Sequence, residues 1–273
     1  MTRYLVVPQW QGSPSSRAMQ LIDGAQAIAG DLPRSATTIL DVPMEAGEGL
    51  GTGIHRLSAL QRIRELTAAA LDSHDEAVLT VGGDCGIALA PIAHAASRVS
   101  ALAVVWIDAH PDFNTPDSSP SGAFSGMVLR AVVGESDPAL ALPGGTVPPG
   151  RVIVAGARSY DDAELDAVAA LGVATLAVDA LRDPAALARA LRATGADGVY
   201  IHVDVDALDP AELAGNAHPE PFGLTLAELT AAIAAVRAEL PLVGASLAGY
   251  SPASAASSTD DLGAILRIVG ALA

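Results

Sequence analysis

Short apolar runs rich in β-branched residues alternate with Ala- and Leu-rich stretches along the whole chain. This alternation is typical of parallel β/α units, in which helices cover buried strands. We expect strands at 3–7, 37–42, 77–81, 102–107, 151–155, 173–178, 199–205 and 241–247. We expect helices at 15–29, 56–72, 86–98, 125–133, 161–171, 184–193, 225–238 and 259–272. The pattern predicts an α/β fold, and an open parallel sheet and a closed (β/α)8 barrel both satisfy it.

Neither a linker nor an internal repeat divides the sequence, so we expect residues 1–273 to form a single domain. Hydrophobic residues make up 51% of the chain and aromatic residues only 3%. Such small apolar side chains favour tight packing of helices on a sheet. The longest irregular segments are 43–55, 111–124, 135–150 and 206–224, and long loops in a compact domain are usually functional.

None of the 15 basic residues is lysine, which excludes a Schiff-base lysine and a phosphate-loop lysine. The formal net charge of −16 argues against nucleic acid or an anionic membrane as a partner. The single cysteine, Cys85, excludes an internal disulfide. The first apolar run is too short for a signal peptide, and no run of about 18 apolar residues predicts a membrane span. We therefore expect a cytoplasmic protein.

Two acidic strings, DAHPD at 108–112 and DVD at 204–206, each end a predicted buried strand. Side chains alternate between the two faces of an extended segment. Asp108, His110 and Asp112 therefore share one face, and Asp204 and Asp206 share another. In parallel sheets, sites form beyond the carboxyl ends of the strands. The two strings should converge there.

Hard oxygen ligands with one imidazole suit Mn²⁺, and Mg²⁺, Co²⁺, Ni²⁺ and Zn²⁺ are compatible with the same ligands. Four or five anionic ligands exceed what one divalent ion needs, so we expect two ions bridged by carboxylates. Such a pair generates hydroxide at neutral pH and polarises the bond that is attacked. The acidic strings therefore indicate hydrolytic chemistry.

Four motifs occur in the order found in one enzyme family: GGD at 82–84, DAHPDFN at 108–114, SGM at 125–127 and DVDALDP at 204–210. In these motifs the chain resembles the arginase/agmatinase/formiminoglutamase (ureohydrolase) family, roughly over residues 75–252. The resemblance implies a three-layer α/β/α domain with an eight-stranded parallel sheet. It also implies attack by a metal-bridging hydroxide on a guanidino or amidino C–N centre, with a urea-type product. A homotrimer or homohexamer is the assembly that it implies.

The same resemblance assigns roles to individual positions. The metal ligands that it implies, for two Mn²⁺ ions per chain, are Cys85, Asp108, His110, Asp112, Asp204 and Asp206. The substrate-binding residues that it implies are Asn114, Ser121, Asp161 and Glu164. The expected catalytic residues are Asp112, Ser125 and His218. An α-amino acid substrate is permitted by these positions and not required.

Three positions depart from the family pattern. Cys85 stands where the family has a metal-binding His, and a thiolate is softer than an imidazole, so the ion there is expected to bind weakly or to be another element. Ser125 stands where a catalytic-loop His is expected, which removes a proton shuttle. Gly249 stands where a carboxylate should bind the guanidinium. We hypothesise that His218 partly replaces the His missing at 125.

These departures leave alternatives open. The substrate is a modified arginine, such as hydroxyarginine, or another guanidine. A second hypothesis is a catalytically weakened family member with a binding or regulatory role. A two-metal phosphatase is a third, for which Arg158 is the only basic candidate. Cys85 itself is a metal ligand, a small buried hydrophobe or, less favoured because no His partner is evident by spacing, a catalytic nucleophile.

Overall fold

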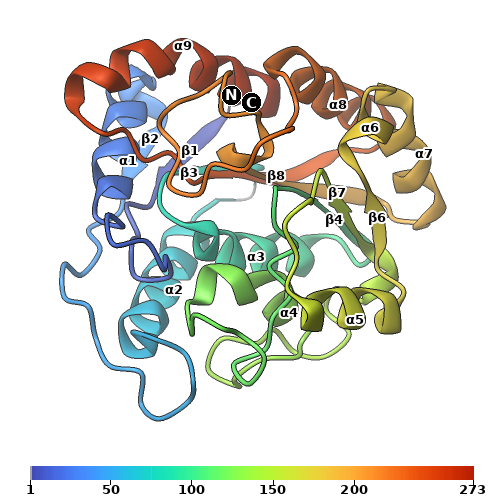
Figure 1. Ribbon diagram of the computed structural model, residues 1–273, viewed down its shortest axis with the longest axis horizontal. Helices are drawn as coiled ribbons and strands as arrows, with labels where there is room; N and C mark the ends of the chain where they lie inside the picture. The colour runs from blue at the N-terminus through green and yellow to red at the C-terminus, as the bar shows by residue number, and fades with distance from the viewer. Residues whose placement is uncertain (1, 75) are drawn as a thin grey trace.

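The computed structural model of the protein describes residues 2–74 and 76–273 and contains one eight-stranded parallel sheet (Figure 1). The strands are β1 (Arg3–Val6), β2 (Thr37–Ile39), β3 (Val78–Val81), β4 (Leu102–Ile107), β5 (Val152–Ala155), β6 (Ala174–Leu176), β7 (Gly198–Asp204) and β8 (Leu242–Ala248). Their order is β2-β1-β3-β8-β7-β4-β5-β6. The sheet is open at β2 and β6, so the alternative of a closed barrel is wrong.

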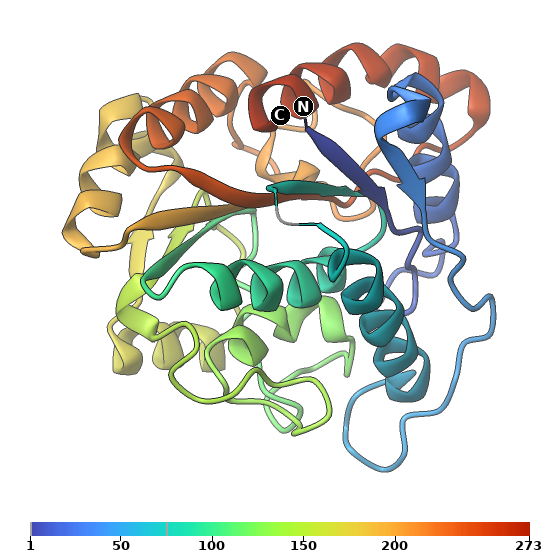
Figure 2. The same ribbon diagram turned by 180° about the vertical axis from the view of Figure 1, so that it is seen from behind.

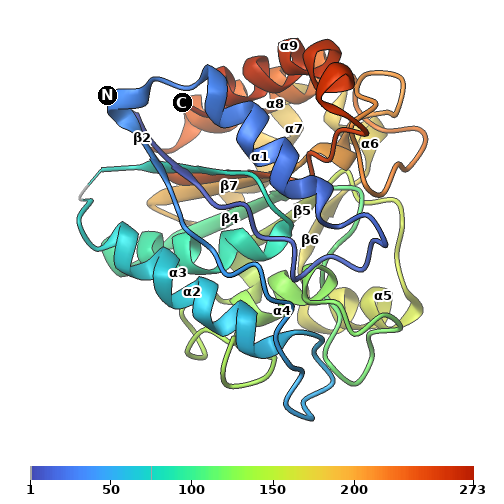
Figure 3. The same ribbon diagram turned by 90° about the vertical axis from the view of Figure 1, so that its left-hand side faces the viewer.

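Helices cover both faces of the sheet and form the predicted three layers (Figures 1 and 2). They are α1 (Gln20–Asp31), α2 (Leu57–Leu71), α3 (Leu89–Arg98), α4 (Val128–Val132), α5 (Asp162–Leu171), α6 (Val178–Leu181), α7 (Pro184–Ala193), α8 (Leu226–Glu239) and α9 (Ala255–Leu272). Helices α2 to α5 pack on one face, and α1 and α6 to α9 pack on the other. Figure 3 shows the sheet between these layers from its β2 edge.

The neighbouring inner strands β7 and β4 are buried along their whole length because helices cover both of their faces. Ile107 pairs with Val203, which pairs in turn with Leu247 of β8. The carboxyl ends of β4, β7 and β8 are therefore level with one another. The residues that follow these strands emerge at one edge of the sheet.

The helix predictions differ from the structure mainly at helix ends. The helix expected at 15–29 begins only at Gln20, and the one expected at 259–272 begins at Ala255, where Ser254 makes a capping box. Helix α6 was not predicted, because four residues are too few to show a periodicity. Within the described residues, no helix is long and apolar enough to cross a membrane.

Candidate metal centre

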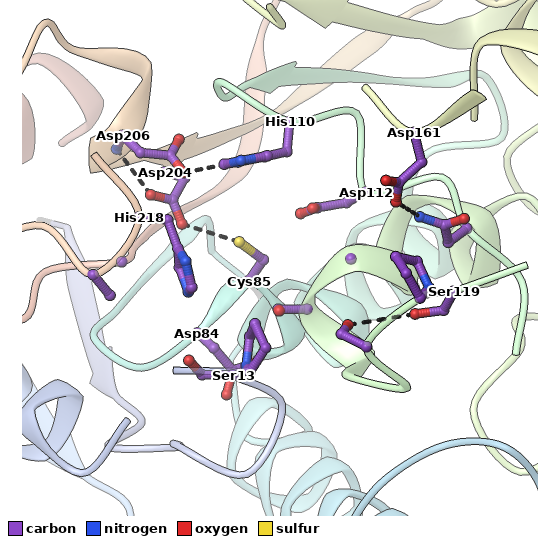
Figure 4. A pocket seen from close by; sticks show the side chains of 18 of the residues that line it. Ser13, Asp84, Cys85, His110, Asp112, Ser119, Asp161, Asp204, Asp206 and His218 are labelled. Atoms are coloured by element: carbon purple, nitrogen blue, oxygen red, sulfur yellow. Dashed lines mark hydrogen bonds and ion pairs between the residues drawn. The ribbon is translucent and has the colours of Figure 1, made fainter. Parts of the chain in front are cut away.

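The acidic strings meet at the carboxyl edge of the central strands, as the sequence predicts. Asp108 directly follows β4, and Asp204 is the last residue of β7. A 3₁₀ turn after β3, Cys85–Ala88, brings Cys85 to the same place. Figure 4 shows Cys85 and Asp204 pointing toward one another beside a pocket of about 140 Å³.

His110 lies between two carboxylates. Its Nδ1 is 2.9 Å from Asp206 Oδ2 and 3.4 Å from Asp108 Oδ1. Backbone N–H groups fix both acids: Ala109 N donates to Asp206 Oδ1 and His110 N donates to Asp108 Oδ1. The three ligand atoms lie close enough together to hold one cation.

Cys85 faces the other side of the same cluster. Its Sγ is 3.0 Å from Asp204 Oδ2 and 3.8 Å from Asp108 Oδ2. Asp204 Oδ1 accepts the N–H of Asp206 at 2.9 Å. Asp108 therefore points one oxygen toward His110 and the other toward Cys85, so its carboxylate joins the two halves of the cluster.

Asp112 completes the group from a strained backbone. Its φ of 50° is in the left-handed region, where Asp is better tolerated than most residues. Asp112 is buried, and its Oδ2 has no hydrogen-bond partner among the described residues. An unpartnered buried carboxylate oxygen beside other acids is the kind of group that a cation would satisfy.

Burial and mutual repulsion disfavour the ionised carboxylates. Desolvation, followed by repulsion between acids, raises the pKa of Asp204 to about 7 and that of Asp206 to about 6. The same two causes raise the pKa of Asp112 well above its usual value. Burial and the neighbouring carboxylates likewise raise the pKa of the Cys85 thiol. The flanking carboxylates outweigh burial at His110 and raise its pKa to about 12.

These residues fit divalent cations. Buried acids that repel one another, with an imidazole and a thiol among them, form a set of donors whose charge cations would compensate. The set contains all six residues for which the resemblance implied metal ligation. The structure brings these six residues close together, and their role as metal ligands stays a prediction.

The predicted substrate residues line or support the same pocket. Asn114 Nδ2 donates to Asp161 Oδ2 at 2.8 Å, and Ser121 Oγ accepts the N–H of Ala123. Glu164 is buried, and its two oxygens accept the N–H groups of Phe113 and Asp161. Asp161 is exposed. Glu164 thus holds Asp161 in place, and Asp161 has the freer carboxylate for a ligand.

The predicted catalytic residues also reach the pocket. His218 and Ser125 both line it, and the rings of His110 and His218 meet edge to face with centroids 6.4 Å apart. His218 Nε2 is buried and has no hydrogen-bond partner within the described part of the chain. Burial lowers the pKa of His218. A neutral imidazole is therefore available beside the cluster.

Gly249 approaches the cluster more closely than the sequence indicates. Its φ is +84°, and a Cβ placed on it would lie 2.2 Å from Asp204 Oδ1. A glutamate at this position would collide with a predicted metal ligand. The backbone here has therefore no room for the carboxylate that the family pattern leads one to expect.

Several pocket residues were not predicted. Ser13, Pro14 and Leu21 close the pocket from the segment between β1 and α1 and from α1, and no motif marks them. Asp84 of the GGD motif, which the sequence marks as either a cap or a residue that orients a metal ligand, also lines the pocket. Its carboxylate caps the 3₁₀ turn by accepting the N–H of Gly86, and it also accepts N–H groups of Gln9 and Gly12. The sequence pattern alone does not reveal a residue that reaches the pocket only through tertiary contacts.

Arg158 has a structural role that disfavours the phosphatase hypothesis. Its guanidinium donates to the backbone carbonyls of Asp206, Glu220 and Pro221. It therefore holds the 206–222 loop, which carries His218, and its N–H groups are engaged by protein carbonyls. The pocket lining contains no arginine among the described residues.

Comparisons with known proteins agree with this geometry. The arginase family model matches residues 16–270. The chain belongs to the arginase family. The chain is 34% identical over 204 residues to an arginase from Bacillus caldovelox, a match that covers 69% of this chain and 68% of that protein. It is 30% identical to an arginase from Staphylococcus aureus, with coverages of 73% and 68%.

Solved structures of arginase-family proteins share the fold. An arginase from Entamoeba histolytica superposes with a TM-score of 0.86 at 22% identity, covering 98% of both chains. A proclavaminate amidino hydrolase from Streptomyces clavuligerus superposes with a TM-score of 0.74 at 22% identity, covering 99% of this chain and 89% of that one. Two solved proteins that share this fold are thus named for different enzyme activities.

Proposed function

We propose that this protein is a two-metal amidinohydrolase that cleaves a C–N bond of a guanidino or amidino compound and releases a urea-type product. The observation that carries the proposal is that Cys85, His110, Asp112, Asp204 and Asp206 line one pocket, with Asp108 within ligand distance of both His110 and Cys85. Membership of the arginase family supports it. Two divalent cations held there supply, when bound, an activated water and polarisation of the carbon that is attacked.

The protein's own residues perform the other tasks. We infer that Asp108 bridges the two cation positions, since its two oxygens face opposite halves of the cluster. Asp112 shares the site through its unpartnered oxygen. Mn²⁺ fits the half made by Asp108, His110 and Asp206, where the donors are carboxylate oxygens and one imidazole.

His218 is the proposed group that moves a proton to the leaving amine. Its lowered pKa keeps the imidazole neutral near neutral pH, so the ring would take up the proton of the attacking water and then pass it to the leaving amine. Nε2 has no competing hydrogen bond among the described residues. Ser125 lines the same pocket, but its hydroxyl can donate a proton only if it accepts another one at the same time. His218 is therefore the better candidate for general acid–base catalysis.

The substrate enters between the 114–121 loop and Asp161. Asp161 is placed by Asn114 and offers a carboxylate for a cationic group of the substrate. Gly249 lines the pocket and offers no carboxylate to the guanidinium end, so selection for an unsubstituted guanidinium is weaker there. We therefore propose a modified arginine or another substituted guanidine as the substrate. The trimer or hexamer and the cytoplasmic location stay predictions.

The test is urea release from a panel of guanidines by metal-loaded protein, with arginine, hydroxyarginine, agmatine and free guanidine as members. We expect turnover of at least one member and a loss of about 100-fold or more in Asp206→Asn. Asp179→Asn is the matched control, because Asp179 lies on the exposed surface of α6. Full metal occupancy with no turnover of any member would overturn the proposal and favour the binding or regulatory role.

A further inference from the structure

His202 lies beneath the metal centre and belongs to no role described so far. A ring nitrogen of His202, Cys85 Sγ and a carboxylate oxygen of Asp108 all lie within 4.8 Å of one another. All three residues are buried. The group is formed by three different strands or strand ends, so the tertiary structure alone brings it together.

Neighbouring strands fix the orientation of the imidazole. His202 precedes Asp204 by two residues in β7, so both side chains are on the same face of the sheet. The ring stacks on Trp106 of β4 with centroids 3.6 Å apart and an interplanar angle of 20°. Its Nδ1 is 2.7 Å from Ser246 Oγ of β8. The stacking and this hydrogen bond hold the ring in one position.

The other ring nitrogen is left without a partner. His202 is fully buried, and its Nε2 makes no hydrogen bond with any described residue. When Nδ1–H donates to Ser246, Nε2 presents a lone pair. Histidines that bind metals show this arrangement, with one nitrogen on the ion and the other donating to a fixed acceptor.

The donors near the His202 imidazole are those of a zinc-type site. In tetrahedral coordination with Zn–S of about 2.3 Å and Zn–O of about 2.1 Å, sulfur and oxygen ligands lie about 3.6 Å apart. Cys85 Sγ lies 3.8 Å from Asp108 Oδ2, close to that value, whereas its 3.0 Å contact with Asp204 Oδ2 is a hydrogen bond. Thiolate and imidazole are softer donors than the carboxylates that suit Mn²⁺.

We propose that Cys85, His202 and Asp108 supply three ligands of a site for a thiophilic divalent cation of the Zn²⁺ type. The proposal rests on the proposed two-metal centre and specifies one of its halves. Cys85 and His202 act there as a pair. Cys85 replaces the histidine that the family pattern has at position 85, and His202 of β7 supplies the nitrogen ligand that is lost by that replacement. The two cations of the centre would then differ, with the harder one beside His110 and the softer one beside Cys85.

The test measures metal binding to metal-free protein, so it does not depend on turnover. Most N/O/S sites bind Zn²⁺ more tightly than Mn²⁺, and the informative quantity is therefore the change between variants. We expect His202→Asn to weaken Zn²⁺ binding at one site by more than about 100-fold, which exceeds the usual effect of losing an outer hydrogen-bond partner. Ser246→Ala should weaken it by about 10- to 100-fold. His74→Asn is the control, and we expect no change.

Co²⁺ serves as a spectroscopic probe of the ligands. We expect one of two bound Co²⁺ ions to show a near-ultraviolet thiolate-to-metal absorption band, which Cys85→Ser abolishes. His202→Cys should retain tight Zn²⁺ binding and strengthen that band, which separates loss of a ligand from loss of folding. Thermal unfolding of each metal-free variant identifies any that do not fold.

Two results would overturn the proposal. One is Zn²⁺ affinity in a folded His202→Asn protein within a few-fold of the wild-type value. The other is a bound Co²⁺ spectrum without a thiolate band. Neither result contradicts the proposed hydrolysis, because a metal centre formed by carboxylates and His110 alone could still catalyse it. Urea release tests that function separately. If the thiolate band is present but no urea is released, the proposed hydrolysis is contradicted and the proposed thiolate site is still supported.

Discussion

Adding one methyl group at Gly249 should damage the metal centre without replacing any predicted ligand. Gly249 has a φ of +84°, and an ideal Cβ on it lies 2.2 Å from Asp204 Oδ1. In Gly249→Ala either the backbone leaves the left-handed region or the carboxylate of Asp204 moves. That carboxylate is not free to move, because Oδ1 accepts the N–H of Asp206 and Oδ2 accepts the Cys85 thiol.

The expected magnitude follows from these two contributions. A non-glycine residue in the left-handed region costs about 1 to 2 kcal/mol. Disrupting a hydrogen bond to a charged group costs about 1.5 to 3 kcal/mol. The free energy of unfolding should therefore fall by about 3 to 5 kcal/mol, and the Tm of the metal-free protein by about 6 to 10 °C at roughly 2 °C per kcal/mol. Metal affinity should fall by about 10- to 100-fold, since Asp204 is displaced.

The assay is thermal unfolding followed by circular dichroism, with and without added metal. Gly263→Ala is the matched control, because Gly263 lies within α9, nothing lies within 4 Å of its added Cβ, and its φ is ordinary. This control should gain about 0.5 to 1 kcal/mol. Gly249→Glu, which returns the family carboxylate, should fail as Gly249→Ala does. A Gly249→Ala protein with wild-type Tm and metal affinity would refute the reasoning.

Three further results are expected. The metal-free protein should lose stability as pH rises from 7 to 9, because the raised pKa of His110 keeps a proton on the folded protein that the unfolded chain releases near pH 6.5. Urea titrations at each pH check this, and saturating metal, which competes with protons, should reverse the trend. His218→Ala should lower kcat by about 100-fold or more and flatten the pH–rate profile, and an unchanged profile contradicts its role. Glu164→Gln should raise KM more than it lowers kcat, since Glu164 accepts the N–H groups of Phe113 and Asp161; equal effects on both constants count against this.

The sequence alone predicted the parallel sheet and the position of the candidate centre. Buried strands such as β4 and β7 are recognisable as continuous apolar runs, because helices cover both of their faces. The side-chain alternation that places Asp108 with His110, and Asp204 with Asp206, is a local property of an extended chain. The carboxyl ends of parallel strands meet at one edge whatever the strand order. These features therefore needed no tertiary information.

The tertiary structure decided the contacts between strands that are far apart in the sequence. The order of the strands determines that the sheet is open, and the register of β4, β7 and β8 puts His202 between Trp106 and Ser246. The sequence gives the face on which His202 lies but not the absence of a hydrogen-bond partner for Nε2. Likewise, the φ of Gly249 and its approach to Asp204 depend on how the loop after β8 packs against β7. Local alternation thus specifies which residues can reach the centre, while non-local packing specifies which atoms face a cation and which positions have no room for a side chain.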